Sequence, residues 1–143
     1  MSYSPNEYSG LLLDHPIACS VYGSSSYNNS YQWVNIIDNT TGDYGYIKPG
    51  QVMEINFGKV VNLTSFYINN YSSSYAATGL KLETSADGSK WNNWGEVSYE
   101  ERGTYYINLS AAEDVQYMRI VFTGGGFNDQ DIEIDGLVFY GNK

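Results

Sequence analysis

The chain has 143 residues, a formal net charge of −9 and only 7 Lys and Arg together. This length is typical of one domain with its own core, so we expect residues 1–143 to form a single domain. The acidic charge argues against nucleic-acid phosphates and anionic lipid surfaces as partners, so we expect no nucleic-acid and no membrane binding. The single cysteine, Cys19, excludes an intrachain disulfide, and its apolar neighbours predict a buried thiol.

Strands are predicted wherever apolar and polar residues alternate. The chain begins with Ser2–Gly10, which is polar and which we expect to be irregular. Trp33–Ile37 fits either a short strand or a single turn. The expected strands are, in chain order, Ile17–Tyr22, Gln51–Phe57, Val60–Ile68, Leu80–Ser85, Gly95–Tyr99, Tyr105–Leu109, Tyr117–Phe122 and Ile132–Tyr140. No segment has a 3.6-residue period, and short strands separated by turn signals are typical of an antiparallel sandwich.

The clearest of these segments is Leu80–Ser85, which leads into Asp87-Gly88 and then Trp91. Leu80, Leu82 and Thr84 alternate here with Lys81, Glu83 and Ser85, which predicts one buried face and one solvent-exposed face. Asp-Gly is a strong tight-turn pair because glycine adopts a positive φ without steric cost.

Aromatic residues are abundant, with 15 Tyr, 3 Trp and 5 Phe. Strands favour Tyr, which accounts for most of these residues. A few are expected on a partly wet binding surface, because Tyr combines an apolar face with a polar tip.

Several motifs occur in an order that resembles one family. They are Ser24-Ser25-Ser26-Tyr27, Ile36-Ile37-Asp38-Asn39, Met53–Gly58, Leu82–Trp91, Tyr117–Phe122 and Gly136–Gly141. Together they resemble the discoidin family, also called coagulation factor V/VIII C-type domains, over roughly Ile17 to Gly141. That family includes many bacterial carbohydrate-binding modules of the galactose-binding-like fold. The resemblance implies an all-β, eight-stranded antiparallel jelly-roll β-sandwich that usually binds rather than catalyses.

In the family the ligand sits on loops at one end of the sandwich, which by order are Gly23–Trp33, Asn69–Thr78 and Gly124–Gln130. All three are rich in Ser, Asn, Gly and aromatic residues, the mixture that sugars need for stacking and hydroxyl recognition. Phe127 is the best single candidate, because a ring flanked by three glycines and Asn-Asp has little reason to be buried. The ligand-binding candidates are Tyr27, Trp33, Tyr71, Tyr75, Phe127, Asn128 and Asp129.

The resemblance also implies a structural calcium ion. Many relatives hold one near the counterpart of Asp38–Thr41, completed by a residue close to the C-terminus. The usual closing Glu is replaced here by Gly136, with Glu133 and Asp135 nearby. Oxygen ligands suit calcium, and the candidate ligands are Asp38, Asn39, Thr41, Asp43 and Glu133.

Two departures leave the sugar class open. Galactose-binding relatives present a His and an Arg in the site, but the only histidine, His15, lies ahead of the first expected strand. Arg119 lies inside an expected strand, where it more simply serves the fold. A catalytic triad would need His15 as its base, but its neighbours Leu13, Asp14 and Pro16 form no recognisable motif. One His and one Cys argue against zinc, and no pair of carboxyls is marked for glycoside hydrolysis, so we expect no enzyme.

The sequence therefore predicts a non-catalytic carbohydrate-binding module that targets a larger secreted or surface protein to a glycan or polysaccharide. An extracellular or cell-surface location and a multidomain parent protein follow from that prediction. The alternative is an adhesion or receptor-binding domain of the same fold, with a protein as its partner.

Overall fold

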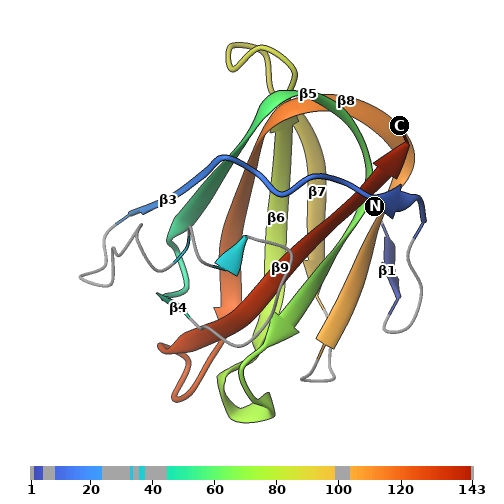
Figure 1. Cartoon of the computed structure of the whole chain (residues 1–143). Helices are drawn as coiled ribbons and strands as arrows, with labels where there is room; N and C mark the ends of the chain where they lie inside the picture. Colours follow the sequence, from blue (N-terminus) through green and yellow to red (C-terminus); the bar gives the residue numbers. More distant parts are fainter. Residues whose placement is uncertain are drawn as a thin grey trace.

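The computed structural model describes residues 2–4, 9–23, 33, 36–37, 45–98 and 104–142 (Figure 1). Its strands are β1 (Ser2–Ser4), β2 (Leu11–Leu12), β3 (Ala18–Tyr22), β4 (Gly45–Ile47), β5 (Val52–Asn70), β6 (Ala77–Ser85), β7 (Asn92–Ser98), β8 (Thr104–Gly125) and β9 (Ile132–Asn142), with one 3₁₀ turn, η1 (Ser73–Tyr75). All pairings between these strands are antiparallel, which confirms the predicted all-β antiparallel class.

The two long strands, β5 and β8, belong to both layers of the sandwich. Val52–Asn56 pairs with Tyr117–Val121, and Val61–Asn69 pairs with Thr104–Val115, with a register shift between the two runs. On one side of the shift these strands pair with β3 and β6, and on the other side with β9 and β1. In Figure 1, β5 and β8 arch over the top of the molecule, so the two layers are joined by the bends.

The number of strands differs from the prediction, because nine are present in the described part of the chain against eight expected. The predicted strands Gln51–Phe57 and Val60–Ile68 are merged in β5, whose pairing with β8 is interrupted by a register shift between Asn56 and Val61 and then resumes. Tyr105–Leu109 and Tyr117–Phe122 are likewise merged in one strand, β8. The irregular start was a wrong prediction for Ser2–Ser4, which pairs with β8 from Tyr106 to Asn108.

The core follows the predicted alternation. Met53, Ile55, Leu80 and Leu82 have no exposed surface. The largest fully buried side chains are Trp33, Phe66, Phe122 and Phe139. Cys19 is also buried, as predicted, and burial raises the pKa of its thiol, which disfavours the reactive thiolate.

Of the two alternatives predicted around Trp33, the described residues support the turn, because Trp33 and Ile36 are helical and the Ile37 N–H donates to the Trp33 carbonyl at 3.2 Å. The side chains of Trp33, Ile36 and Ile37 are all buried in the core.

Candidate functional site

Two loops meet at one end of the sandwich, one between β5 and β6 and the other between β8 and β9 (Figure 1, bottom). The Gly126 N–H donates to the Ala76 carbonyl at 2.9 Å and joins them directly. The Tyr71 N–H donates to the Glu133 carbonyl at 2.9 Å and ties the first loop to β9. The loops are therefore held by backbone hydrogen bonds to each other and to the sheet.

The second loop is a tight turn at Phe127–Gln130. The Gln130 N–H donates to the Phe127 carbonyl at 3.1 Å, and the two central residues, Asn128 and Asp129, have φ values of 55° and 56°. Two successive left-handed residues define a type I′ turn, and Asn and Asp adopt this conformation more readily than other non-glycine residues. The Phe127 N–H also donates to the Asp131 carbonyl at 2.8 Å, which closes the base of the turn.

Gly126 is required where the turn begins. Its φ is +87°, and a Cβ there would lie 2.7 Å from the carbonyl carbon and oxygen of Asp131 and 2.9 Å from Cγ1 of Ile132. Only a glycine tolerates both this backbone angle and this close approach. The turn therefore presents Phe127 at a position that the backbone determines.

Three predicted site residues lie together on these loops. The ring of Tyr75 stacks on the ring of Phe127, with centroids 5.4 Å apart and planes at 27°. The ring of Tyr71 meets the ring of Tyr75 edge-on, with centroids 6.0 Å apart. Phe127 is 49% exposed and Tyr71 is 51% exposed, whereas Tyr75 is half-buried between them. Tyr75 covers one face of Phe127, and we name this group the aromatic cluster.

Phe127 also borders an open hollow of about 470 Å³. Its described lining residues are Ser73, Ser74, Gly126, Phe127, Asn128 and Asp129. The side chains of Asn128 and Asp129 make no hydrogen bond or ion pair with any residue that the structure describes. The hollow thus combines one aromatic ring with hydroxyl, amide and carboxylate groups that a ligand can reach.

Sequence reasoning did not single out Ser73 and Ser74, although their loop was named. The signal was the Ser72-Ser73-Ser74 run between two loop tyrosines. What brings these serines to the hollow is the 3₁₀ turn, in which the Tyr75 N–H donates to the Ser72 carbonyl at 3.1 Å.

Two carboxyl groups, those of Asp131 and Glu133, follow the turn in the chain. Burial raises the pKa of Asp131, with a smaller opposing effect of Lys48, and burial together with Asp131 raises the pKa of Glu133. Oδ1 of Asp131 is buried and has no hydrogen-bond partner within the described ranges. A buried oxygen without a partner is compatible with a cation ligand.

The remaining predicted calcium ligands, Asp38, Asn39, Thr41 and Asp43, lie outside the described residues, as does the sugar-site candidate Tyr27. Within the residues that the structure describes, no group of three His, Cys, Asp or Glu side chains is close enough to hold a metal ion.

The prediction for Trp33 requires correction. The side chain has no exposed surface and belongs to the core, so its ring cannot stack on a sugar. Its position at the end of a polar loop suggested exposure, but the helical turn directs the ring inward.

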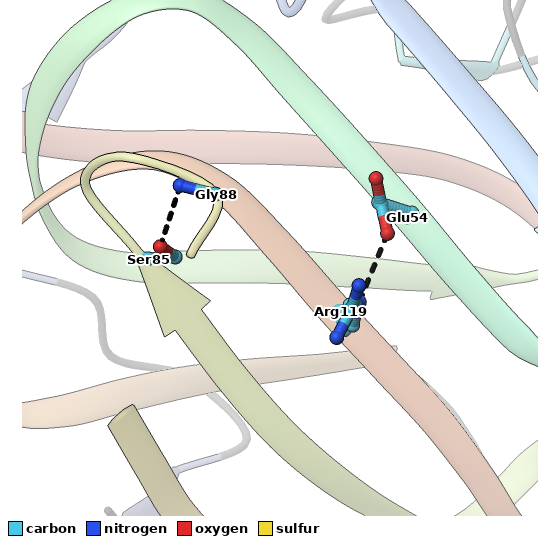
Figure 2. A network of polar contacts seen from close by, with 4 residues as sticks. All are labelled: Glu54, Ser85, Gly88 and Arg119. Atoms are coloured by element: carbon cyan, nitrogen blue, oxygen red, sulfur yellow. Dashed lines mark hydrogen bonds and ion pairs between the residues drawn. The ribbon is translucent and has the colours of Figure 1, made fainter. Parts of the chain in front are cut away.

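Arg119 serves the sheet, as predicted. It lies on β8 between the buried residues Met118 and Ile120, and therefore points away from the core. Its Nε donates to Glu54 Oε2 at 2.9 Å (Figure 2), and its guanidinium carbon lies 3.8 Å from the centroid of the Trp91 ring. The side chain thus links β5, β8 and the segment after β6, away from the hollow.

The sequence profile of the F5/8 type C domain family matches residues 20–132, so the chain belongs to this family. No curated protein sequence matches it. In the part of the chain that the structure describes, no helix has the length and apolar character needed to cross a membrane.

Several solved structures from Clostridium perfringens have the same fold. CBM32-3 from a family 31 glycoside hydrolase is 19% identical, with a TM-score of 0.71 over 92% of this chain and 95% of that one. The family 32 carbohydrate-binding module of NanJ, in complex with galactose, is 16% identical (TM-score 0.67, 85% and 91% covered). CpGH89CBM32-5, in complex with GalNAc-β-1,3-galactose, is 12% identical (TM-score 0.67, 85% and 93% covered). These similarities confirm the predicted galactose-binding-like sandwich.

Proposed function

We propose that this domain is a non-catalytic carbohydrate-binding module that holds a glycan in the hollow beside Phe127. The observation that carries the proposal is the half-exposed Phe127 ring, which borders a hollow lined by hydroxyl, amide and carboxylate groups. An aromatic face packs against the C–H patch of a sugar, and the surrounding polar groups hydrogen-bond to its hydroxyls.

Tyr75 acts as a positioning residue in this proposal. It stacks on Phe127 but does not line the hollow, so it fixes the ring without contacting the sugar. A ring that is already ordered loses less conformational entropy on binding.

The family and its solved relatives support this function. The NanJ module was solved with galactose and CpGH89CBM32-5 with GalNAc-β-1,3-galactose. The similar module CBM32-3 is part of a glycoside hydrolase, which supports a multidomain parent protein for this domain. A module that targets such a protein to polysaccharide would work outside the cell or at its surface. Galactose itself is not assigned, because His15 precedes β3 and Arg119 lies on the sheet, both away from the described lining of the hollow.

We also propose a structural calcium ion held by Asp38, Asn39, Thr41, Asp43 and Glu133. Glu133 is 5% exposed, and the neighbouring Asp131 has a buried carboxyl oxygen without a partner in the described chain. A cation bound by Glu133 would neutralise its buried carboxyl and offset the repulsion from Asp131 beside it. Gly136, at the place of the family's closing Glu, contributes no side-chain ligand.

The test is a screen of the purified domain against immobilised glycans and free sugars, with and without EDTA. We expect binding at micromolar to millimolar concentration, or about −8 to −4 kcal/mol. Phe127→Ala should weaken it by about 2 kcal/mol, roughly thirtyfold, without a change in unfolding midpoint. Binding that survives EDTA, together with a lower unfolding midpoint, supports calcium as a purely structural ion.

Tyr22→Ala is the matched control, since Tyr22 is 42% exposed but lies on β3. Equal weakening by both variants would contradict a site at Phe127.

Absence of binding to every glycan would favour the alternative, a protein-interaction domain. One observation favours that function independently. Four apolar side chains outside the hollow are 49–64% exposed, namely Leu11, Leu12, Ile17 and Val60. An exposed apolar group of this kind can be part of a protein interface.

A further inference from the structure

The charge of the hollow is one-sided. Of its six described lining residues, Asp129 is the only charged one, and the other side-chain groups are two hydroxyls, an amide and the Phe127 ring. Lys48 does not line the hollow. Its charge lowers the pKa of Asp131, which follows the turn, but burial raises that pKa by more. The whole chain carries a net charge of −9.

We propose that the hollow selects uncharged sugars, and that Asp129 is the specificity-determining residue that rejects sugars bearing a carboxylate. This inference rests on the proposed function, because it concerns the ligand of the same site. It names a substrate class, neutral saccharides, and excludes uronic and sialic acids.

The geometry of the turn carries the argument. Asp129 occupies the second central position of the type I′ turn, two residues after Phe127, and lines the same hollow as the ring. It is exposed and has no ion-pair partner within the described chain that would neutralise it. A sugar stacked on Phe127 occupies the hollow that Asp129 also lines, so a carboxylate on that sugar and the Asp129 carboxylate repel each other, and salt weakens this repulsion.

For a neutral sugar the same carboxylate is favourable, because it accepts hydrogen bonds from hydroxyl groups. A sugar carboxylate has no proton to donate and adds repulsion. The same side chain therefore attracts one class of ligand and rejects the other, as specificity requires.

The two central turn residues offer a pair of opposite variants. Asp129→Asn removes the charge, and Asn128→Asp adds one beside it. Both residue types tolerate left-handed backbone, so neither change disturbs the turn. Asp14→Asn is the control for net charge, since Asp14 is 79% exposed and pairs with Lys59 at 3.2 Å.

The control lies far from the hollow. Asp14 and Lys59 border a second hollow that also contains Asn62 on β5, whereas the sugar site lies beyond Asn70 at the end of the same strand. Eight residues of strand correspond to roughly 26 Å, well beyond a Debye length.

The experiment first identifies a neutral sugar that the wild-type domain binds, with galactose and N-acetylgalactosamine among the probes. It then compares that sugar with its uronic acid, for example galactose with galacturonic acid, by titration calorimetry. The two probes differ only at C6, where CH₂OH becomes a carboxylate. We expect the acid to bind about three- to tenfold more weakly, with the difference shrinking at high salt.

Asp129→Asn should bring the two affinities together, Asn128→Asp should separate them further, and Asp14→Asn should leave their ratio unchanged. If the neutral sugar binds but the acid binds equally well, or if Asp129→Asn leaves the ratio unchanged, this inference is overturned while the proposed function stands. If no sugar binds the wild-type domain, the proposed function fails and the inference fails with it.

Discussion

The domain has two tight turns rich in polar residues, and their side chains have opposite roles. One turn follows Ser85 at the end of β6, and the other, between β8 and β9, lies near Ala77 at the start of β6. In the turn after β6, Ser85 Oγ accepts from the Gly88 N–H at 2.8 Å (Figure 2). Asp87 Oδ1 accepts from the N–H groups of Ser89 and Lys90 at 2.8 and 2.9 Å. The polar side chains of this turn are thus engaged by its own backbone.

The turn at Phe127–Gln130 is closed by its main chain alone. Its backbone N–H groups donate to backbone carbonyls, and the side chains of Asn128 and Asp129 bond to nothing in the described chain. The comparison teaches that composition does not distinguish a structural turn from a binding turn. A turn whose closure leaves its polar side chains unused is the one able to bind a ligand.

Gly126→Ala should give the largest effect, because it breaks the closure of the binding turn. A left-handed alanine and the overlap with Asp131 should destabilise the fold by about 3 kcal/mol. Displacement of the Phe127 ring should also abolish sugar binding. Chemical denaturation and sugar titration measure the two effects.

Gly50→Ala is the matched control. Gly50 has a φ of +92°, but a Cβ there would meet nothing within 4 Å. We expect about 1 kcal/mol of strain and unchanged sugar affinity. Equal destabilisation by both variants would show that the close approach at Gly126 does not matter.

Ser85→Ala should have a smaller effect, confined to the structural turn. Ser85 is 1% exposed, and its hydroxyl accepts from two backbone N–H groups, those of Asp87 and Gly88. Loss of these bonds should cost about 1 kcal/mol in unfolding free energy and leave sugar affinity unchanged. Ser98→Ala, at an exposed position on β7, should stay within about 0.5 kcal/mol of the wild type. A drop in sugar affinity for Ser85→Ala would contradict the separation of the two turns.

The smallest effect should come from pH. The N–H groups of Lys90 and then Ser89 hold the pKa of Asp87 below its ordinary value of 3.8. A lowered pKa means that Asp87 contributes stability above that value, and that this contribution disappears as the pH falls through the folded pKa. Asp87→Asn should therefore be less stable than the wild type at neutral pH and equal to it in acid, measured by urea unfolding across the pH range. A difference that persists in acid would assign the effect to packing rather than charge.

Alternation along the chain was sufficient to predict most of the sheet. It placed Met53, Ile55, Leu80 and Leu82 in the core, because a strand puts successive side chains on opposite faces. It did not predict that β5 and β8 each bend through both layers, since a local pattern cannot tell a bend from a break. It also missed β1, whose pairing with β8 is a contact between distant segments.

The site divides in the same way. The sequence by itself determined that Phe127 stands in a glycine-rich turn with Asn-Asp, where no neighbour pattern calls for burial, and the ring is exposed. Only the tertiary structure decided that Tyr75 covers one face of that ring, that Ser73 and Ser74 line the hollow, and that Trp33 belongs to the core. The physical reason is the distance in sequence over which each effect acts. Backbone preference is set by adjacent residues, whereas stacking and burial depend on strand pairings that bring residues 73 and 127 together.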